Sequence, residues 1–304
     1  MLSLDDVVAA RATLAGRLPH TPMLTSRALG ARLKCELFQR TGSFKARGAL
    51  NKLSSLSPEE KARGVITVSA GNHAQAVAWA AAETNTSALV VTSARASAQK
   101  IDATRAYGAN VDLEAQTWSQ AFDRLAQLLD ETGRVLVHPH EDPLVLAGAG
   151  TIGLEVLEDA PDADAVLVAV GGGGLIAGIQ AAIGDRVRVI AVEPELSPAF
   201  HAAVDAGGPI ALEPSSIADG CNAPRLGRLP YELCKDLERV LVTEADIEDA
   251  FRFLYARAKL AVEPAGAVAA AALLTQKVEA EHPVVVVSGG NVATQIASGI
   301  LALR

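Results

Sequence analysis

Lys45 lies in a sequence context that suits a lysine doing covalent chemistry. It follows the small polar turn Thr41-Gly42-Ser43 and one aromatic residue, Phe44. A lysine held in such a place can be partly desolvated, and desolvation favours the neutral amine over the ammonium form. The neutral amine is the form that attacks an aldehyde cofactor to make a Schiff base. The alternative is an ordinary solvated surface lysine, and the rest of the chain must decide between the two.

Four consecutive glycines, Gly171, Gly172, Gly173 and Gly174, stand between a run that predicts a strand and a run that predicts a helix. Backbone N–H groups that no Cβ shields, at the positive end of a helix, can hold a phosphate. The run is not a Walker loop, because no Gly-Lys-Ser/Thr follows it, and it lacks the GxGxxG pattern with its downstream acidic residue. A tight packing turn between strand and helix is the alternative.

The segment Ser69-Ala70-Gly71-Asn72-His73 is a second turn from strand to helix. Its N–H groups would suit a carboxylate, and the Asn72 amide could bond a phenolic or carboxylate oxygen. An ordinary helix N-cap explains the same residues equally well.

A third turn, at residues 288–291, begins with Ser288. A serine hydroxyl can hydrogen-bond a neutral ring nitrogen, whereas an aspartate there would hold a protonated one. His73, His138 and His140 do not have the spacing of a zinc site, so structural roles are favoured and no metal is predicted.

The elements that must position these turns alternate between short apolar strands and longer helices. We expect strands at residues 65–68, 88–91, 110–113, 134–138, 165–170, 187–192 and 284–287, with helices ending near residues 83, 107, 130, 157 and 183. This alternation predicts a mainly parallel α/β protein whose ligands bind at the carboxyl ends of the strands. The elements lengthen after about residue 140, which predicts a small lobe at residues 51–140 and a large lobe at residues 1–50 and 141–304.

Helix boundaries can also be predicted. Ser57 with Glu60, and Thr243 with Asp246, have the spacing of capping boxes. The expected helix at residues 144–157 contains three glycines at 148, 150 and 153. We expect these glycines to interrupt it near its start.

Composition excludes several classes of function. The 304 residues are 50% hydrophobic, carry a net charge of −8 and contain no basic run, so neither nucleic acid nor an anionic membrane surface is an expected partner. The spacing of Cys35, Cys221 and Cys234 fits neither a disulfide framework nor a metal site, which is typical of reduced cytoplasmic thiols. The N-terminus does not resemble a signal peptide. The uncharged window at residues 165–184 is better explained by strand, glycine loop and helix than by a membrane span.

Nine segments, taken together and in order, carry a family resemblance: LKCELFQRTGSFKARGALNKL, SAGNHAQAVA, KIDATRAYGANV, HPHEDPLVLAGAGTIGLEVL, VGGGGLIAGI, VEP, IADG, VEPAGA and SGGN. They resemble the pyridoxal-phosphate-dependent threonine/serine dehydratase and serine racemase family, which has the tryptophan synthase β-like fold called fold type II. The resemblance runs from about residue 21 to residue 291. It implies a two-lobed fold with mainly parallel sheets flanked by helices.

The resemblance also implies which residues hold the cofactor, pyridoxal 5'-phosphate. Lys45 would carry it as a Schiff base, with Phe44 and Gly220 on the two faces of its ring. Asn72 would hydrogen-bond the phenolic oxygen and Ser288 the ring nitrogen, while Glu263 would stand near the ring. The phosphate would be held by Gly171, Gly172, Gly173, Gly174 and Leu175.

The substrate would lie beside the second turn. The resemblance implies that its carboxylate is lined by Ser69, Ala70, Gly71, Asn72 and His73. His140 occupies a position that varies in the family, and we expect it to touch the side chain of the substrate.

Two departures from the family bear on function. The racemase branch has a second serine, which acts as an acid and base, where this chain has Ala70; alanine cannot transfer a proton, so racemisation is disfavoured. The family's divalent-cation site would use Glu193 and an aspartate, but the aspartate's position holds Ala199. No metal is therefore expected.

The expected function is a dehydratase, or ammonia-lyase, that converts L-threonine or L-serine to a 2-keto acid and ammonia. Three alternatives stay open. One is a serine racemase, and a second is a 3-hydroxyaspartate dehydratase, if a partly charged His140 favours an anionic side chain. The third is a catalytically silent pyridoxal-phosphate-binding module. The cysteine content predicts a cytoplasmic protein, and the family resemblance implies a homodimer or homotetramer.

Overall fold

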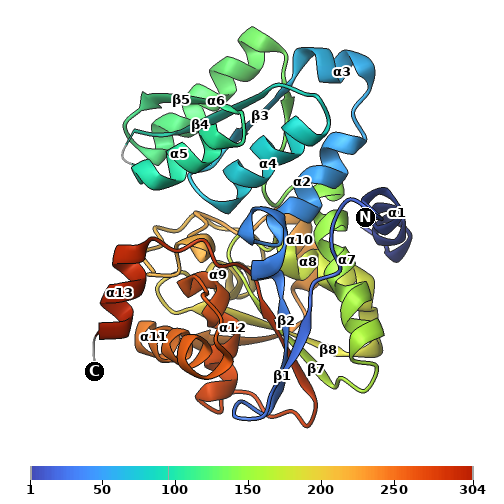
Figure 1. Cartoon of the computed structure of the whole chain (residues 1–304), viewed down its shortest axis with the longest axis vertical. Helices are drawn as coiled ribbons and strands as arrows, with labels where there is room; N and C mark the ends of the chain where they lie inside the picture. Colours follow the sequence, from blue (N-terminus) through green and yellow to red (C-terminus); the bar gives the residue numbers. More distant parts are fainter. Residues whose placement is uncertain (1, 95, 303–304) are drawn as a thin grey trace.

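The chain forms two α/β bodies, each built around its own sheet (Figure 1). The structure, a computed structural model, describes residues 2–94 and 96–302. The larger sheet has the strand order β1-β2-β10-β7-β8-β9 and the smaller the order β5-β4-β3-β6. Of the pairings between these strands, only that of β1 with β2 is antiparallel. The predicted class, mainly parallel sheets flanked by helices, is confirmed.

The strands of the larger sheet are β1 (Met23–Ser26), β2 (Ala31–Cys35), β7 (Ala165–Ala169), β8 (Arg188–Pro194), β9 (Glu238–Val242) and β10 (Pro283–Val287). Those of the smaller sheet are β3 (Val65–Val68), β4 (Ala88–Ser93), β5 (Asn110–Ala115) and β6 (Val135–Leu136). Helices α3 (Pro58–Arg63), α4 (Asn72–Glu83), α5 (Ala98–Ala106) and α6 (Trp118–Thr132) accompany the smaller sheet in Figure 1. The remaining helices are α1 (Leu4–Leu14), α2 (Lys45–Ser54), α7 (Pro143–Asp159), α8 (Gly174–Ile183), α9 (Ala199–Ala206), α10 (Arg228–Cys234), α11 (Glu244–Phe253), α12 (Pro264–Leu274) and α13 (Thr294–Ala302).

The larger sheet is buried on both faces, as parallel sheets are. In β10, Val285 and Val287 pack into a core with α11 and α12, whereas Val284 and Val286 pack into a second core with α7 and α8. Successive side chains of a strand point to opposite faces, so a run of four valines supplies both cores.

The uncharged window at residues 165–184 is β7, a glycine loop and α8, as predicted. Within residues 2–94 and 96–302, no helix is long and apolar enough to cross a membrane.

Helix α2 connects the two bodies. Its residues Ala49, Leu50 and Leu53 join the core of the smaller sheet, while its first turn lies among the loops of the larger one. The expected lobe boundary at residues 50 and 51 falls inside this helix, and the division at 51–140 stays a prediction.

The strand expected at residues 134–138 is shorter than predicted. Strand β6 covers only Val135–Leu136, because the carbonyl of Val137 accepts hydrogen bonds from side chains instead of from a neighbouring strand. Thr67 Oγ1 donates to it at 2.8 Å and His73 Nε2 at 2.9 Å.

Both predicted capping boxes are confirmed, at Ser57 with Glu60 and at Thr243 with Asp246. The expected interruption of the glycine-containing helix is wrong, because α7 runs unbroken from Pro143 to Asp159. Its glycines make room for neighbouring helices. A Cβ at Gly148 would lie 2.5 Å from the Arg47 carbonyl oxygen of α2.

Candidate functional site

The candidate site lies at the carboxyl ends of the parallel neighbours β2 and β10, where ligands bind in α/β sheets. A bridge between Ser43 and Gly289 ties together the loops that leave these strands. The backbone N–H of Phe44 also donates to the Ser288 carbonyl at 3.1 Å. These contacts fix the start of α2, whose first residue is Lys45.

Lys45 is held as an amine that ionises near neutral pH. Its Nζ donates to the carbonyl of Pro139 at 3.2 Å and lies 4.9 Å from the centre of the Phe44 ring. Burial of the ammonium group lowers the pKa of Lys45 from 10.5 to about 8. Part of the protein therefore carries Lys45 as a neutral, nucleophilic amine at pH 7 to 8.

The glycine loop connects β7 to α8 and has no space for side chains. A Cβ at Gly171 would lie 2.9 Å from Cys221 Cα, and one at Gly173 would lie 2.6 Å from Pro230 Cβ. Gly173 also has a φ of +87°, which favours glycine. The first N–H groups of α8 have no partner within their helix, so the loop offers an anion a row of donors.

The second turn reaches the site from the smaller sheet. The N–H of Gly71 bonds Ser69 Oγ at 3.2 Å, and no other group lies within 4 Å of where a Gly71 Cβ would be. Asn72 begins α4, and its Nδ2 crosses to the larger body to donate to Glu263 Oε1 at 2.6 Å. The half-buried Ser69 and Ala70 line the same turn.

Glu263 is a buried carboxyl at the N-cap of α12 and is 3% exposed. Burial, and secondarily the charge of Asp219, raise the pKa of Glu263 from 4.5 to about 8. The carboxyl is therefore mostly protonated at pH 7. Its neighbour Ser288 is also buried, and its hydroxyl donates to the Ala265 carbonyl at 3.4 Å.

Gly220 belongs to the short helix Asp219–Cys221. A Cβ at Gly220 would lie 2.9 Å from Ala265 Cβ, so the backbone packs closely against the start of α12. The preceding residue, Asp219, pairs with Lys100 of α5 in the smaller body.

The histidines form a group of neutral rings around Lys45. Burial and the Lys45 charge lower the pKa of His73 to about 3, and its ring bonds the Val137 carbonyl. The His73 side chain is thus buried in the protein and bonded to its backbone. Burial, and secondarily the charge of His138, lower the pKa of His140 well below 6.5. His140 stacks edge-on against His138 at 4.7 Å, and its ring lies where a Gly172 Cβ would be.

The neutral state of His140 bears on the expected substrate. The electrostatic argument for an anionic substrate side chain needs a partly charged imidazole, and the lowered pKa removes that charge at neutral pH.

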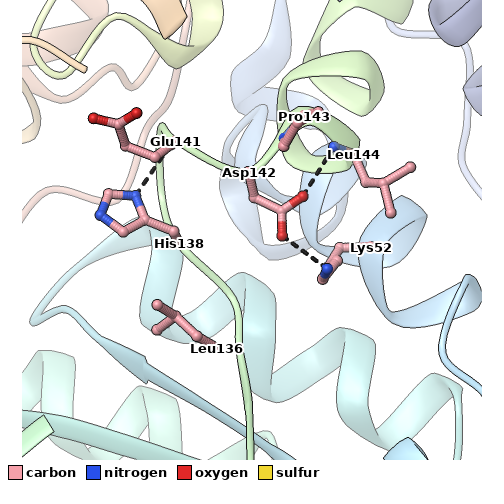
Figure 2. A pocket seen from close by; sticks show the side chains of 7 residues that line it. All are labelled: Lys52, Leu136, His138, Glu141, Asp142, Pro143 and Leu144. Atoms are coloured by element: carbon pink, nitrogen blue, oxygen red, sulfur yellow. Dashed lines mark hydrogen bonds and ion pairs between the residues drawn. The ribbon is translucent and has the colours of Figure 1, made fainter. Parts of the chain in front are cut away.

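An open cleft of about 490 Å³ is lined in part by His138 (Figure 2). Asp142 accepts from Lys52 Nζ at 2.9 Å and from the Leu144 N–H, also at 2.9 Å, while His138 accepts from the Glu141 N–H at 3.1 Å. The remaining lining residues are Leu136 and Pro143. Phe44, Lys45 and Gly174 lie around one narrow gap that is too small for a water molecule, so the lysine lies close to the last glycine of the loop; the other lining residues are Gly48, Pro139, Val145 and Ala149.

Glu193 is already engaged within the protein. Its buried carboxylate accepts from the Phe200 N–H at 2.7 Å, from the His201 N–H at 3.0 Å and from His201 Nδ1 at 2.7 Å. Across the part of the chain that the structure describes, no group of three His, Cys, Asp or Glu side chains could hold a metal ion. The position expected to supply the second carboxylate of the family's divalent-cation site holds Ala199, so Glu193 is the one carboxylate at these two positions.

The arrangement does fit pyridoxal phosphate. It brings together a desolvated lysine amine for an aldehyde, an N–H cradle for a phosphate and an amide donor on Asn72. The buried hydroxyl of Ser43 has no hydrogen-bond partner among the described residues, so a polar atom at the site is left unsatisfied. Asn291 belongs to the third turn but carries no sequence pattern that predicts a role in the site; its Nδ2 donates to Asn72 Oδ1 at 2.8 Å.

Comparison with known proteins points to the same chemistry. The family described as "Pyridoxal-phosphate dependent enzyme" matches residues 16–290. An L-threonine ammonia-lyase of Thermotoga maritima is 41% identical, over 99% of this chain and 78% of that protein. The L-threonine dehydratase catabolic TdcB of Escherichia coli is 40% identical, over 96% of this chain and 93% of that protein.

Two solved structures are similar over nearly the whole chain. The threonine deaminase of the organism abbreviated T.th. has a TM-score of 0.90 and 38% identity, and the comparison covers 96% of this chain and 99% of that one. Maize serine racemase has a TM-score of 0.93 and 34% identity, covering 96% of this chain and 94% of that one.

Proposed function

Because the chain belongs to the family of pyridoxal-phosphate-dependent enzymes, we propose that it is an ammonia-lyase that converts L-threonine or L-serine to a 2-keto acid and ammonia. The observation that carries the proposal is that a proton acceptor is present on one face of the expected cofactor position, whereas the residue expected on the opposite face cannot transfer a proton. Lys45 has a pKa of about 8, and the position expected to supply an acid and base on the opposite face holds Ala70.

The cofactor would supply an electron sink for the negative charge that develops at Cα. Lys45, Phe44, Asn72, Glu263, Ser288 and Gly220 would surround its ring, and residues 171–174 with Leu175 would hold its phosphate. The Ser288 hydroxyl, as a neutral partner for the ring nitrogen, would keep that sink moderate.

The protein residues then have defined tasks. The N–H groups at the start of α4, near Gly71 and Asn72, would hold the substrate carboxylate. The freed Lys45 amine would remove the Cα proton. The β-hydroxyl would then leave as water, so that the proton removed from Cα and the departing hydroxyl together make up that water. A second water would displace the nitrogen as ammonia, and the net products are a 2-keto acid and ammonia.

The test is keto-acid release from the cofactor-loaded protein given L-threonine, L-serine, D-serine and 3-hydroxyaspartate separately. We expect product from L-threonine or L-serine. Lys45→Ala should lower the rate by at least about a hundredfold, because it removes the base, and should abolish the visible absorption of the bound cofactor. Normal turnover by this variant, or silence of the loaded wild type with all four substrates, would refute the proposal.

Racemisation is the rival reading, since maize serine racemase is a close structural neighbour. It requires a proton donor on the face opposite Lys45, and Ala70 cannot be one. Chiral chromatography of serine after reaction distinguishes the two activities, and formation of the opposite enantiomer faster than pyruvate would favour the racemase.

We further propose a cytoplasmic homodimer or homotetramer with lobes at residues 51–140 and at 1–50 with 141–304. The naming of the relatives as catabolic dehydratases and ammonia-lyases of amino acids supports a metabolic enzyme. Light scattering on the eluting protein would give its mass in solution, and a monomer would contradict the proposed assembly.

A further inference from the structure

Asn291 is the centre of a chain of side-chain hydrogen bonds that crosses the site. Its Nδ2 donates to the carbonyl of Thr41 at 2.6 Å and to Oδ1 of Asn72 at 2.8 Å. Asn72 Nδ2 in turn donates to Glu263 Oε1 at 2.6 Å. The chain joins the loop after β2, the loop after β10, the start of α4 and the N-cap of α12.

The direction of this chain is set at the Thr41 end. A backbone carbonyl can only accept, so Asn291 must present its NH₂ group there, and that group has two hydrogens. The second hydrogen meets Asn72, which must then present Oδ1. The NH₂ group of Asn72 is thereby turned to the opposite side, toward Glu263.

Glu263 cannot set the direction by itself. Burial raises the pKa of Glu263 to about 8, and a protonated carboxyl can both donate and accept. It would therefore bond the Asn72 amide in either of its two orientations. Only the fixed acceptor at Thr41 distinguishes them.

The Thr41 carbonyl is held firmly in place. Thr41 has a φ of +59°, which is unfavourable for a β-branched residue and persists only where surrounding contacts require it. Those contacts are the Gly42 N–H bonding the Gln39 carbonyl, and the Gly290 N–H bonding the Gly42 carbonyl, both at 2.9 Å.

We propose that Asn291 is a positioning residue that orients the Asn72 carboxamide, so that Asn72 presents an N–H to the phenolic oxygen of the cofactor. This inference rests on the proposed function, because it takes the role of Asn72 from there. One hydrogen of the Asn72 NH₂ group goes to Glu263 and the other stays available to the cofactor. Without Asn291, the amide can turn and present Oδ1, an acceptor, to an oxygen that also accepts.

The first test is Asn291→Ala in the cofactor-loaded protein. We expect the visible absorption band of the cofactor to shift, and the cofactor to dissociate roughly two- to tenfold faster, as suits the loss of about one hydrogen bond. The matched control is Asn51→Ala. Asn51 is buried and, like Asn291, donates to a backbone carbonyl, that of Leu144, at 2.8 Å, but it does not bond Asn72. We expect this control to lower the melting temperature while leaving the band and the dissociation rate unchanged.

A double-mutant cycle separates positioning from a purely structural role. If Asn291 acts through Asn72, adding Asn291→Ala to Asn72→Ala should change neither the absorption band nor the dissociation rate further. Independent, additive effects on these two readouts would overturn the proposal, and so would a wild-type band in Asn291→Ala. If Asn291→Ala does not fold, Asn291→Ser, whose side chain is too short to reach both acceptors, is measured in its place.

The outcome is distinguishable from failure of the proposed function. A wild type that binds the cofactor but releases no keto acid would refute the lyase alone, and the absorption and dissociation measurements would still decide the role of Asn291. A wild type that binds no pyridoxal phosphate would overturn both.

Discussion

Lys45 is a base and Glu263 an acid, yet the pKa of each is shifted in the direction that favours its neutral form. Burial lowers the pKa of the lysine and raises that of the carboxyl, to about 8 in both cases. Both shifts have the same physical cause, a site that solvates charge poorly. Such a site suits chemistry that needs a neutral amine, and it strengthens every hydrogen bond made inside it.

Glu263 gives a prediction about stability and pH. The folded cofactor-free protein keeps this carboxyl protonated up to about pH 8, whereas the unfolded chain ionises it near 4.5. At Glu263 the unfolded state therefore binds fewer protons between these pH values, and the contribution of this carboxyl to the free energy of unfolding should fall as pH rises from about 5 to 8. Glu263→Gln keeps an acceptor for Asn72 but cannot ionise, so this contribution should vanish.

The measurement is urea unfolding of the cofactor-free wild type and Glu263→Gln at several pH values from 5 to 8. We expect the variant to gain stability relative to the wild type as pH rises. Parallel stability profiles would show that Glu263 ionises normally in the folded protein.

At the scale of elements, α2 is positioned by ionic contacts on one side and by a close helix crossing on the other. Arg47 donates to both Glu36 oxygens at 2.8 Å and to Glu155 Oε1 at 2.6 Å. All three side chains are buried. Removing one partner of such a buried set is costly because the remaining charges are left unpaired. The network holds the helix that begins with Lys45 against β2 and α7.

The helix crossing gives the second prediction. A Cβ at Gly148 of α7 would lie 2.5 Å from the Arg47 carbonyl and 2.7 Å from Gly48 Cα, both backbone atoms that cannot move aside. Gly148→Ala should therefore destabilise the protein by about 1–3 kcal/mol, the usual cost of overpacking, and should lower activity by displacing α2. Urea unfolding and keto-acid release measure the two effects.

Gly299 in α13 is the matched control for this substitution. It is also a helical glycine, but none of the described residues outside its own helical backbone lies within 4 Å of where its Cβ would be. Gly299→Ala should raise stability by up to about 1 kcal/mol through helix propensity alone. If both variants behaved alike, the close helix crossing would not be the cause.

Sequence patterns predicted the parts of the molecule that are local. The strands at residues 65–68 and 284–287, the glycine loop and both capping boxes depend on neighbours in the chain, and the structure has them. The bond between Asn72 and Glu263 joins residues 191 positions apart, and that between Asn291 and Asn72 spans 219. The spacing of residue types along the chain cannot predict contacts between residues so far apart in the sequence. The unbroken course of α7 was not predicted for a related reason. Glycines weaken an isolated helix, but in this structure Gly148 gives the backbone of α2 the room to pack against α7.

At the scale of the whole molecule, the two bodies meet around the candidate site. Asn72 and Lys100 of the smaller body reach Glu263 and Asp219 of the larger, and α2 and the segment at residues 137–142 run between them (Figure 1). The site is complete only when the two bodies are together. Contacts between them should therefore affect substrate binding more than they affect folding.

The Lys100–Asp219 ion pair tests this expectation. Its side chains are 23% and 50% exposed, and exposed pairs contribute at most about 1 kcal/mol to stability. Lys100→Ala should leave the melting temperature nearly unchanged. It should raise KM for the substrate, because the smaller body is held less firmly over the loop that contains Gly220. Added salt should raise the wild-type KM in the same direction, because salt screens exposed pairs, and should affect the variant less.

Arg105→Ala is the control for Lys100→Ala. Arg105 lies on the same helix and pairs with Asp102 at 3.8 Å, within α5 and away from the larger body. The Arg105→Ala variant loses one positive surface charge, as Lys100→Ala does, but it keeps the Lys100–Asp219 contact between the two bodies. We expect a KM close to that of the wild type and an unaltered response to salt. An equal rise of KM in both variants would mean that the net charge of α5 attracts the substrate, and that the pair with Asp219 does not hold the bodies together.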